Sequence, residues 1–347
     1  METKIWFVDK QMNLSTSYEQ VQQAAILLQQ NEVVAFPTET VYGLGGNATS
    51  NIAVERIYEA KGRPSDNPLI VHIADKSQLH LLVEDIPAYA EKLMDAFWPG
   101  PLTLVLPVIQ GTVSTKVTAG LSTIAVRIPE HPVALAIIKE TSLPIAAPSA
   151  NLSGKPSPTK ADHVWKDLNG KIAGIVDGGE TGVGLESTVV DCSEGIPVIL
   201  RPGGITKEQL EEVVGIVKID PALTKREEVP KSPGMKYTHY APKAPLWLVD
   251  GSNEYLQSLV NKQQQKGKRV GVLTTDESFE QYKANVVLSC GTRSDLSTIA
   301  NKLYSILREF DDSDVDIIFS EIFPLEGVGE AVMNRLEKAA GYQRVKE

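Results

Sequence analysis

Short apolar runs alternate along the chain with stretches in which apolar residues recur at helical spacing. The run Val33 to Phe36 is rich in β-branched residues and ends at Pro37, so it predicts a buried strand. Ser17 to Gln30 and Asn51 to Ala60, on either side of it, are predicted to be helices. Further strands are predicted at Leu69 to Ile73, Leu102 to Leu106, Leu143 to Ala147 and Val198 to Leu200. Such alternation is typical of an α/β fold.

The composition changes between Val217 and Pro245, where prolines, charges and turn-forming residues replace the apolar periodicity. We interpret residues 216–245 as a linker between a larger domain at residues 1–215 and a smaller one at residues 246–347. Strand-like and helix-like runs alternate again in the smaller domain. It is therefore predicted to be a Rossmann-like α/β domain with a parallel sheet.

Composition and charge narrow the class of protein. The chain of 347 residues is 42% hydrophobic and 22% charged, as folded globular proteins are, and its net charge of −10 argues against a broad basic surface for nucleic acid. Cys192 and Cys290 lie far apart in strand-like contexts, so we expect two reduced core residues and neither a disulfide framework nor a zinc site. No apolar run reaches the roughly 18 residues of a membrane span and no secretion signal is evident, which predicts a cytoplasmic protein.

A polar segment follows the Val33 to Phe36 run. Its polar side chains belong to Thr38, Glu39, Thr40 and Tyr42. They come just after a predicted strand, which is where open α/β sheets bind ligands. Gly43, Gly45 and Gly46 come next, and glycine lets the backbone turn tightly or approach a ligand closely. Taken alone, the segment is an ordinary strand-to-helix loop; the rest of the chain favours a binding site.

Cationic residues point to an anionic ligand. Lys61 and Arg63 lie in a predicted turn rich in glycine and proline, where both cations either point toward a polyphosphate or carboxylate or face solvent. Arg127 lies inside an apolar predicted strand, and a buried guanidinium without an anionic partner costs several kcal/mol. Its partner is either a protein Asp or Glu or the carboxylate of a ligand.

Donor-rich residues follow two other predicted strands. Ser149, Asn151 and Ser157 cluster between prolines, without the Gly-x-Ser-x-Gly pattern of a nucleophile elbow, so binding is favoured over covalent catalysis. Arg201 lies at the end of the strand Val198 to Leu200. His72 lies in a predicted strand, where a lone histidine is usually structural.

Motifs spaced along nearly the whole chain resemble one family. The motifs are FPTETVYGLG, KGRPSDNPLIVHI, FWPGPLTLVL, VTAGLSTIAVRIPEHP, PIAAPSANLSGKPSPT, GVGLESTVVD, LRPGGIT and SPGMKYTHYAP. In this order they resemble the threonylcarbamoyl-adenylate synthases in their long form, with a YrdC-type catalytic domain and a C-terminal domain. The resemblance implies a twisted, open α/β sheet in residues 1–215.

The resemblance also implies an activity and a set of binding residues. The family joins L-threonine, bicarbonate and ATP into threonylcarbamoyl-AMP, releases pyrophosphate, and supplies the modification of a tRNA adenosine next to the anticodon. Threonine would be held by Thr38, His72, Arg127, Ala147 and Ser187, with Arg127 on its carboxylate. ATP would be held by Lys61, Arg63, Thr123, Ser149, Asn151, Ser157, Arg201 and Tyr237. Mg²⁺ would be bound through the phosphates, without direct protein ligands.

The same resemblance implies partners and a moving segment. The product would pass to the machinery that transfers the threonylcarbamoyl group to tRNA, with tRNA contact possible but weak and no membrane involved. Tyr237 lies in the predicted linker, beside Lys236, His239 and Tyr240. We interpret this aromatic segment as a lid over the nucleotide, with simple attachment of the two domains as the alternative.

Two other functions remain as alternatives. An RNA-binding module without turnover is disfavoured because neither domain is basic; residues 245–347 contain 12 basic and 16 acidic residues. A carbamoyl-adenylate enzyme of hydrogenase maturation would carry zinc fingers, which two cysteines exclude.

Overall fold

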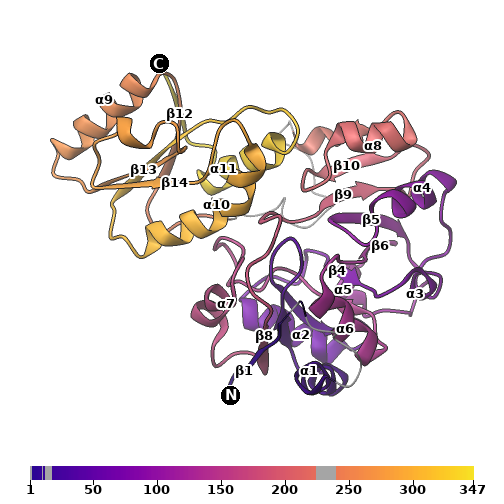
Figure 1. Cartoon of the computed structure of the whole chain (residues 1–347). Coiled ribbons are helices and arrows are strands. Elements are labelled where there is room, and N and C mark those ends of the chain that lie inside the picture. Colours follow the sequence, from indigo (N-terminus) through magenta and orange to yellow (C-terminus); the bar gives the residue numbers. More distant parts are fainter. Residues whose placement is uncertain (1, 10, 12–17, 224–239) are drawn as a thin grey trace. The chain divides into compact units, whose positions relative to one another are not determined.

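The computed structural model describes residues 2–9, 11, 18–223 and 240–347 (Figure 1). The chain divides into two compact units. The first contains Met1–Ser153, Pro158–Gly182 and Glu186–Lys236, and the second contains Gly154–Ser157, Val183–Leu185 and Tyr237–Glu347. Each unit is built around its own sheet. The predicted domain and linker boundaries stay predictions.

The first unit holds a mixed sheet in the order β1-β8-β2-β3-β7-β4-β6-β5-β9-β10-β11. Its strands are β1 (Lys4–Phe7), β2 (Val34–Phe36), β3 (Gly43–Asn47), β4 (Ile70–His72), β5 (Leu102–Pro107), β6 (Thr123–Arg127), β7 (Ile145–Ala146), β8 (Gly174–Asp177), β9 (Thr188–Asp191), β10 (Val198–Arg201) and β11 (Lys218–Ile219). The central strands β4 and β6 run parallel, and β7 and β5 flank them in the opposite direction. The mixed sheet confirms the α/β class.

Helices cover both faces of this sheet. They are α1 (Glu19–Gln29), α2 (Asn51–Lys61), α3 (Lys76–Leu79), α4 (Ala88–Phe97), α5 (Thr115–Thr118), α6 (Pro132–Thr141), α7 (Ala161–Leu168) and α8 (Lys207–Val214), with a short 3₁₀ helix at Pro221–Leu223. Successive residues of a strand point to opposite faces. Val34 and Phe36 belong to one buried cluster with α1 and α6, which lie side by side in Figure 1. Val33 and Ala35 belong to a second cluster, which also contains residues of α2, α4, α7 and α8.

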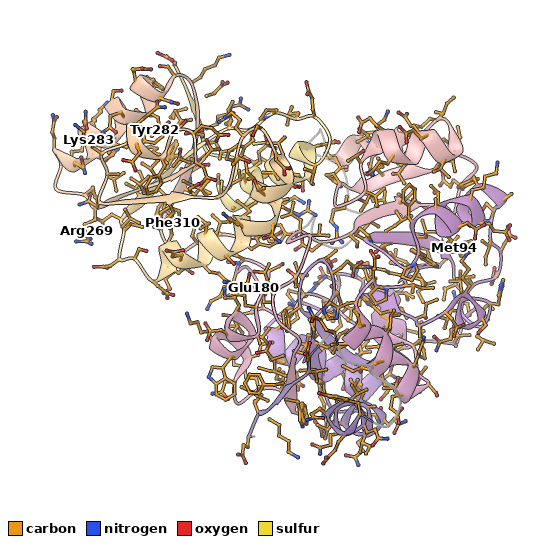
Figure 2. All side chains as sticks on the ribbon, viewed as in Figure 1. Met94, Glu180, Arg269, Tyr282, Lys283 and Phe310 are labelled. Carbon is orange, nitrogen blue, oxygen red and sulfur yellow. The ribbon has the colours of Figure 1, made fainter. Side chains whose placement is uncertain are left out.

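The second unit has a five-stranded sheet in the order β14-β13-β15-β12-β16, and every strand pair is parallel. Its elements are β12 (Leu246–Asp250), α9 (Asn253–Gln264), β13 (Val270–Thr274), a 3₁₀ turn at Phe279–Gln281, β14 (Val286–Ser289), α10 (Leu296–Asp311), β15 (Ile317–Glu321), α11 (Gly329–Ala339) and β16 (Arg344–Lys346). Of the side chains that Figure 2 labels in this unit, Phe310 on α10 is buried in the core, whereas Arg269 and Lys283 are exposed. The predicted parallel α/β domain is confirmed.

Two local predictions need correction. The segment after β2 is not a strand-to-helix loop, because Gly43, Gly45 and Gly46 belong to β3 and complete a β-hairpin with β2. Lys61 is the last residue of α2 and does not lie in the following turn. Helix α1 is described from Glu19, and the predicted start at Ser17 lies outside the described residues. Cys192 and Cys290 are both buried and free, as predicted for core residues.

Candidate functional site

The polar segment Pro37 to Tyr42 is the buried loop of the β2–β3 hairpin. Neighbouring segments hold its backbone. Tyr42 donates its N–H to the carbonyl of Pro158 and accepts the N–H of Ala150, both at 2.8 Å. Gly182 donates its N–H to the carbonyl of Glu39 at 3.0 Å. A buried loop fixed in this way holds its side chains in defined positions.

Hydrogen bonds join this loop to the end of β6. Arg127 Nη1 donates to Thr40 Oγ1 at 3.0 Å. Thr40 Oγ1 lies 2.8 Å from Thr38 Oγ1, which donates to the carbonyl of Val41 at 2.7 Å. Because the single proton of Thr38 is used on Val41, Thr40 must donate to Thr38. The chain of bonds therefore points the lone pairs of Thr40 at the guanidinium.

An ion pair between Glu39 and Arg127 lies beside these hydroxyls. Arg127 Nη2 is 2.5 Å from Glu39 Oε1, and the side chains are 4% and 11% exposed. Arg127 Nε donates to the carbonyl of Gly100 at 3.1 Å. The buried arginine thus has a protein carboxylate as its partner, which is one of the two alternatives that the sequence left open. Neither oxygen of Glu39 has a well-aligned hydrogen bond to any residue that the structure describes.

His72 ends β4 directly beside Arg127, its partner in the parallel β4–β6 pair. Burial, and then the positive charge of Arg127, lower the pKa of His72 to about 3. The imidazole is therefore neutral near pH 7. Because the ring of His72 is neutral, the positive charge of this pair of residues lies on Arg127.

Ser187 and Arg201 form a second group. Arg201 donates from Nε and Nη2 to the carbonyl of Ser187 at 3.1 and 3.0 Å, and Nη2 also reaches Ser187 Oγ at 3.2 Å. Thr103 Oγ1, on β5, lies 2.7 Å from Ser187 Oγ. The structure brings these two predicted residues together. Part of the guanidinium of Arg201 serves to position Ser187.

Lys61, Ser149 and Asn151 form a third group. Lys61 is buried, and its ammonium donates to the carbonyls of Ser149 and Asn151, the latter at 2.8 Å. Ser149 Oγ donates to Asn151 Oδ1 at 2.6 Å. An isolated bridge also pairs Ser149 with Gly43 of the hairpin. Lys61 thus ties the donor-rich loop to the end of α2, and the bridge at Ser149 ties the same loop to the hairpin that carries Glu39.

The remaining predicted residues are more dispersed. Arg63 borders a cavity of about 500 Å³ with Tyr58 and Lys116, and its Nη2 lies 3.4 Å from the carbonyl of Asn67. Lys61 and Arg63 therefore contact different backbone carbonyls, and their shared role at an anionic ligand stays a prediction. Thr123 begins β6, four residues before Arg127, or about 13 Å at the usual rise per residue.

Three other predicted residues complete the set. Ala147 is buried, and its N–H donates to the carbonyl of Ile70 at 2.9 Å. Ser157 is buried and belongs to the second unit. Tyr237 lies outside the described residues, so the lid hypothesis is left as it stood.

The side chains near the predicted nucleotide site can be compared with what a metal ion needs. Within the described part of the chain, no three His, Cys, Asp or Glu side chains lie close enough together to hold a metal ion. The groups around Lys61 are hydroxyls, amides and an ammonium. Such a set fits a magnesium ion that arrives with a nucleotide and keeps water and phosphate oxygens as ligands.

The sequence did not assign roles to Glu39 and Thr40, which contact Arg127 directly. A signal was present. A buried arginine needs a carboxylate, and the hairpin motif FPTETVYGLG carries one. What the sequence lacked was the fold that brings the β2–β3 loop to the end of β6.

The chain is similar to known proteins over nearly its whole length. The family described as "Telomere recombination", which takes in Sua5, YciO and YrdC, matches residues 26–203, and "Threonylcarbamoyl-AMP synthase, C-terminal domain" matches residues 205–341. A Threonylcarbamoyl-AMP synthase of Bacillus subtilis is 62% identical over 98% of this chain and 99% of the relative, and one of Pyrococcus abyssi is 50% identical over 93% and 94%. The crystal structure of P. abyssi Sua5 complexed with L-threonine superposes with a TM-score of 0.93, at 47% identity, over 99% of this chain and 100% of that one.

Fold and site together are those of a protein that binds a small ligand with a carboxylate group. A mixed sheet covered on both faces, with a buried guanidinium, a neutral imidazole and donor-rich loops, is suited to a small substrate that carries a carboxylate. The chain belongs to the Sua5 family of threonylcarbamoyl-AMP synthases, in the form that has both the YrdC-type domain and the C-terminal domain. Among the helices of the described residues, none is long and apolar enough to cross a membrane.

Proposed function

We propose that this protein makes threonylcarbamoyl-AMP from L-threonine, bicarbonate and ATP, with release of pyrophosphate. Membership of the Sua5 family supports the proposal, as does the name of relatives that match almost the full chain. The observation that carries it is the buried Arg127, placed among Glu39, Thr40 and His72. A site of this kind recognises a small carboxylate by charge-assisted, forked hydrogen bonds.

Threonine binds at the end of β6 in this proposal. Arg127 takes the carboxylate and Ser187 supplies a hydroxyl, while Thr38 contributes by holding the Thr40 hydroxyl that accepts from Arg127. His72, kept neutral by burial and by Arg127, offers a hydrogen bond without a competing charge. Ala147 lines the same space. The solved P. abyssi relative was crystallised with L-threonine, which is consistent with this ligand.

ATP binds along the donor-rich loops. Lys61 and Arg201 provide positive charge, and Ser149, Asn151, Thr123 and Ser157 provide short polar groups for the ribose and phosphates, with Arg63 at the outer side. When bound, magnesium neutralises phosphate charge and holds the triphosphate in one shape. The roles of Ser157 and of Tyr237, the lid residue, rest on the family resemblance.

The chemistry needs positioning more than a protein nucleophile. The threonine amine adds to bicarbonate with loss of water and gives a carbamate. A carbamate oxygen then attacks the α-phosphorus of ATP, the bond from that phosphorus to the bridging oxygen breaks, and pyrophosphate leaves. Holding the carbamate oxygen in line with the bond that breaks at the α-phosphorus accounts for much of the rate enhancement in reactions of this type. The unstable product would be handed to an enzyme that transfers its acyl group to a tRNA adenosine.

The test is a pyrophosphate assay with purified full-length protein, ATP and magnesium. We expect release that requires both L-threonine and bicarbonate, and that stops when either is omitted. Serine and valine, which each lack one group of the threonine side chain, are the matched substrates. Release that is independent of added amino acid would refute the proposed reaction.

A further inference from the structure

The Glu39–Arg127 pair has an unusual balance of contacts. Arg127 donates hydrogen bonds from Nε to the Gly100 carbonyl and from Nη1 to Thr40, while its Nη2 meets Glu39 in an ion pair without a well-aligned hydrogen bond. Glu39 is 11% exposed in its side chain and has the guanidinium as its charged partner. Both of its oxygens lack a well-aligned hydrogen bond to the described residues. Buried carboxylates normally accept several hydrogen bonds, so this one has acceptor capacity left for a ligand.

The unused acceptor positions of Glu39 become important when a substrate binds to Arg127. A threonine carboxylate can occupy the Nη2 side of Arg127 only by displacing Glu39 from it. Glu39 would then be a buried, unpaired charge, which is costly. An α-amino acid carries an ammonium close to its carboxylate, so the same ligand that displaces Glu39 also supplies it with a new cation. A guanidinium and a carboxylate in contact are thus complementary to a zwitterion.

We propose that Glu39 binds the ammonium of the substrate and accepts its proton, while Arg127 binds the carboxylate. This inference rests on the proposed function and adds a catalytic residue to it. One ammonium proton passes to Glu39, and the freed nitrogen attacks the carbon of bicarbonate. The C–OH bond breaks, and the hydroxide leaves as water with a second proton from the nitrogen. Glu39 then returns its proton to solvent.

The test compares two ligands on two variants by calorimetry in the absence of ATP. The ligands are L-threonine and 3-hydroxybutanoate, which keeps the carboxylate and hydroxyl but lacks the ammonium. In Glu39→Gln we expect threonine affinity to fall at least about tenfold. The affinity for 3-hydroxybutanoate should stay or rise, because no protein carboxylate competes for Arg127.

The control is Glu32→Gln. Glu32 pairs with Arg56 at 2.8 Å in a more exposed Glu–Arg pair, and both ligands should bind it as they bind the wild type. Turnover provides a second readout, because Glu39→Gln should lower kcat at saturating threonine as well as raise KM. A residue that only holds Arg127 in place would weaken both ligands alike, and that result overturns the inference.

Glu39→Gln can fail to fold, since it leaves Arg127 without its anion. Wild-type protein then decides the matter, because 3-hydroxybutanoate should bind it at least about tenfold more weakly than threonine. Equal affinities would overturn the inference while leaving the proposed function intact. Wild-type protein that binds no threonine would instead refute the proposed function, and this inference with it.

Discussion

Arg127 is the residue on which most of the site depends. Replacing it with alanine would leave Glu39 buried without a partner, at about 3–5 kcal/mol of unfolding free energy, so Arg127→Lys is the cleaner variant. Lysine keeps the charge but not the forked contact. We expect threonine affinity to fall by roughly 1.5–3 kcal/mol with ATP affinity unchanged, measured by calorimetry.

Arg56→Lys is the matched control for this variant, since Arg56 pairs with Glu32 at a more exposed position. It should leave both affinities as in the wild type. If folded Arg127→Lys binds threonine normally, Arg127 serves only as the structural partner of Glu39.

His72 makes stability depend on pH. Its pKa is about 3 in the folded protein because of burial and the charge of Arg127, and near 6.5 in an unfolded chain. Between these values the unfolded chain binds a proton that the folded protein excludes, so stability falls as the pH drops from about 6.5 toward about 3. In His72→Gln we expect a smaller loss of unfolding free energy between about pH 7 and about pH 5, measured in urea.

His80→Gln is the control for this prediction, because His80 is exposed. It should lose as much stability over the same pH interval as the wild type does. The role assigned to His72 is wrong if the two histidine variants follow the same pH curve.

Lys61 tests the nucleotide half of the site. Lys61→Met keeps a long side chain but removes the ammonium that binds the carbonyls of Ser149 and Asn151. We expect about tenfold weaker ATP binding, with threonine affinity retained. The control is Lys76→Met, which removes an exposed lysine paired with Asp95. Wild-type ATP affinity in Lys61→Met would make this lysine purely structural.

The sequence predicted which of these residues need a partner, but it did not predict which groups they contact. The apolar neighbours of Arg127 in the sequence predicted that it needs a carboxylate. They did not identify Glu39, because Glu39 and its neighbour Thr40 lie far away in the sequence; 87 positions separate Thr40 from Arg127. Lys61 was expected at a ligand on the basis of its charge. Its bonds to two backbone carbonyls depend on how α2 packs on a distant loop.

At the scale of elements, the β2–β3 hairpin shapes the site and depends on its glycines. A Cβ on Gly45 would lie 2.5 Å from the ring of Phe36 and 3.0 Å from Ile145. Gly45→Ala should therefore lower the unfolding free energy by about 1–3 kcal/mol, measured by urea denaturation. Gly195→Ala is the control, since a Cβ there meets nothing within 4 Å. Equal stability of the two variants would mean that the hairpin tolerates extra volume.

The hairpin was also the element that the sequence predicted least well. Gly43, Gly45 and Gly46 have little intrinsic preference for a strand, and the pattern therefore indicated a turn. In the folded protein they lie in β3, which pairs with β2 and β7, and the side chains packed against them leave no room for larger residues. By contrast, β5 was predicted to within one residue, since its apolar run is continuous.

At the scale of the whole molecule, the α/β class and the parallel sheet of the second unit were predictable from alternating periodicities. Strand β16 was not predicted, because Arg344 to Lys346 has two charged residues and one apolar residue, and its place in the sheet comes from pairing with β12. The order of strands in the first sheet was beyond the sequence as well, since β8 inserts between β1 and β2 from more than a hundred residues away.

The proposed reaction joins threonine and the carbon of bicarbonate to the AMP part of ATP. Mass spectrometry of the nucleotide product, made with ¹³C-bicarbonate and wild-type protein, tests it most directly. We predict a threonine- and AMP-containing product that is one mass unit heavier than the product made with unlabelled bicarbonate, and that is absent without threonine. A nucleotide product without the ¹³C atom, or formation of the same product without threonine, would contradict the claim.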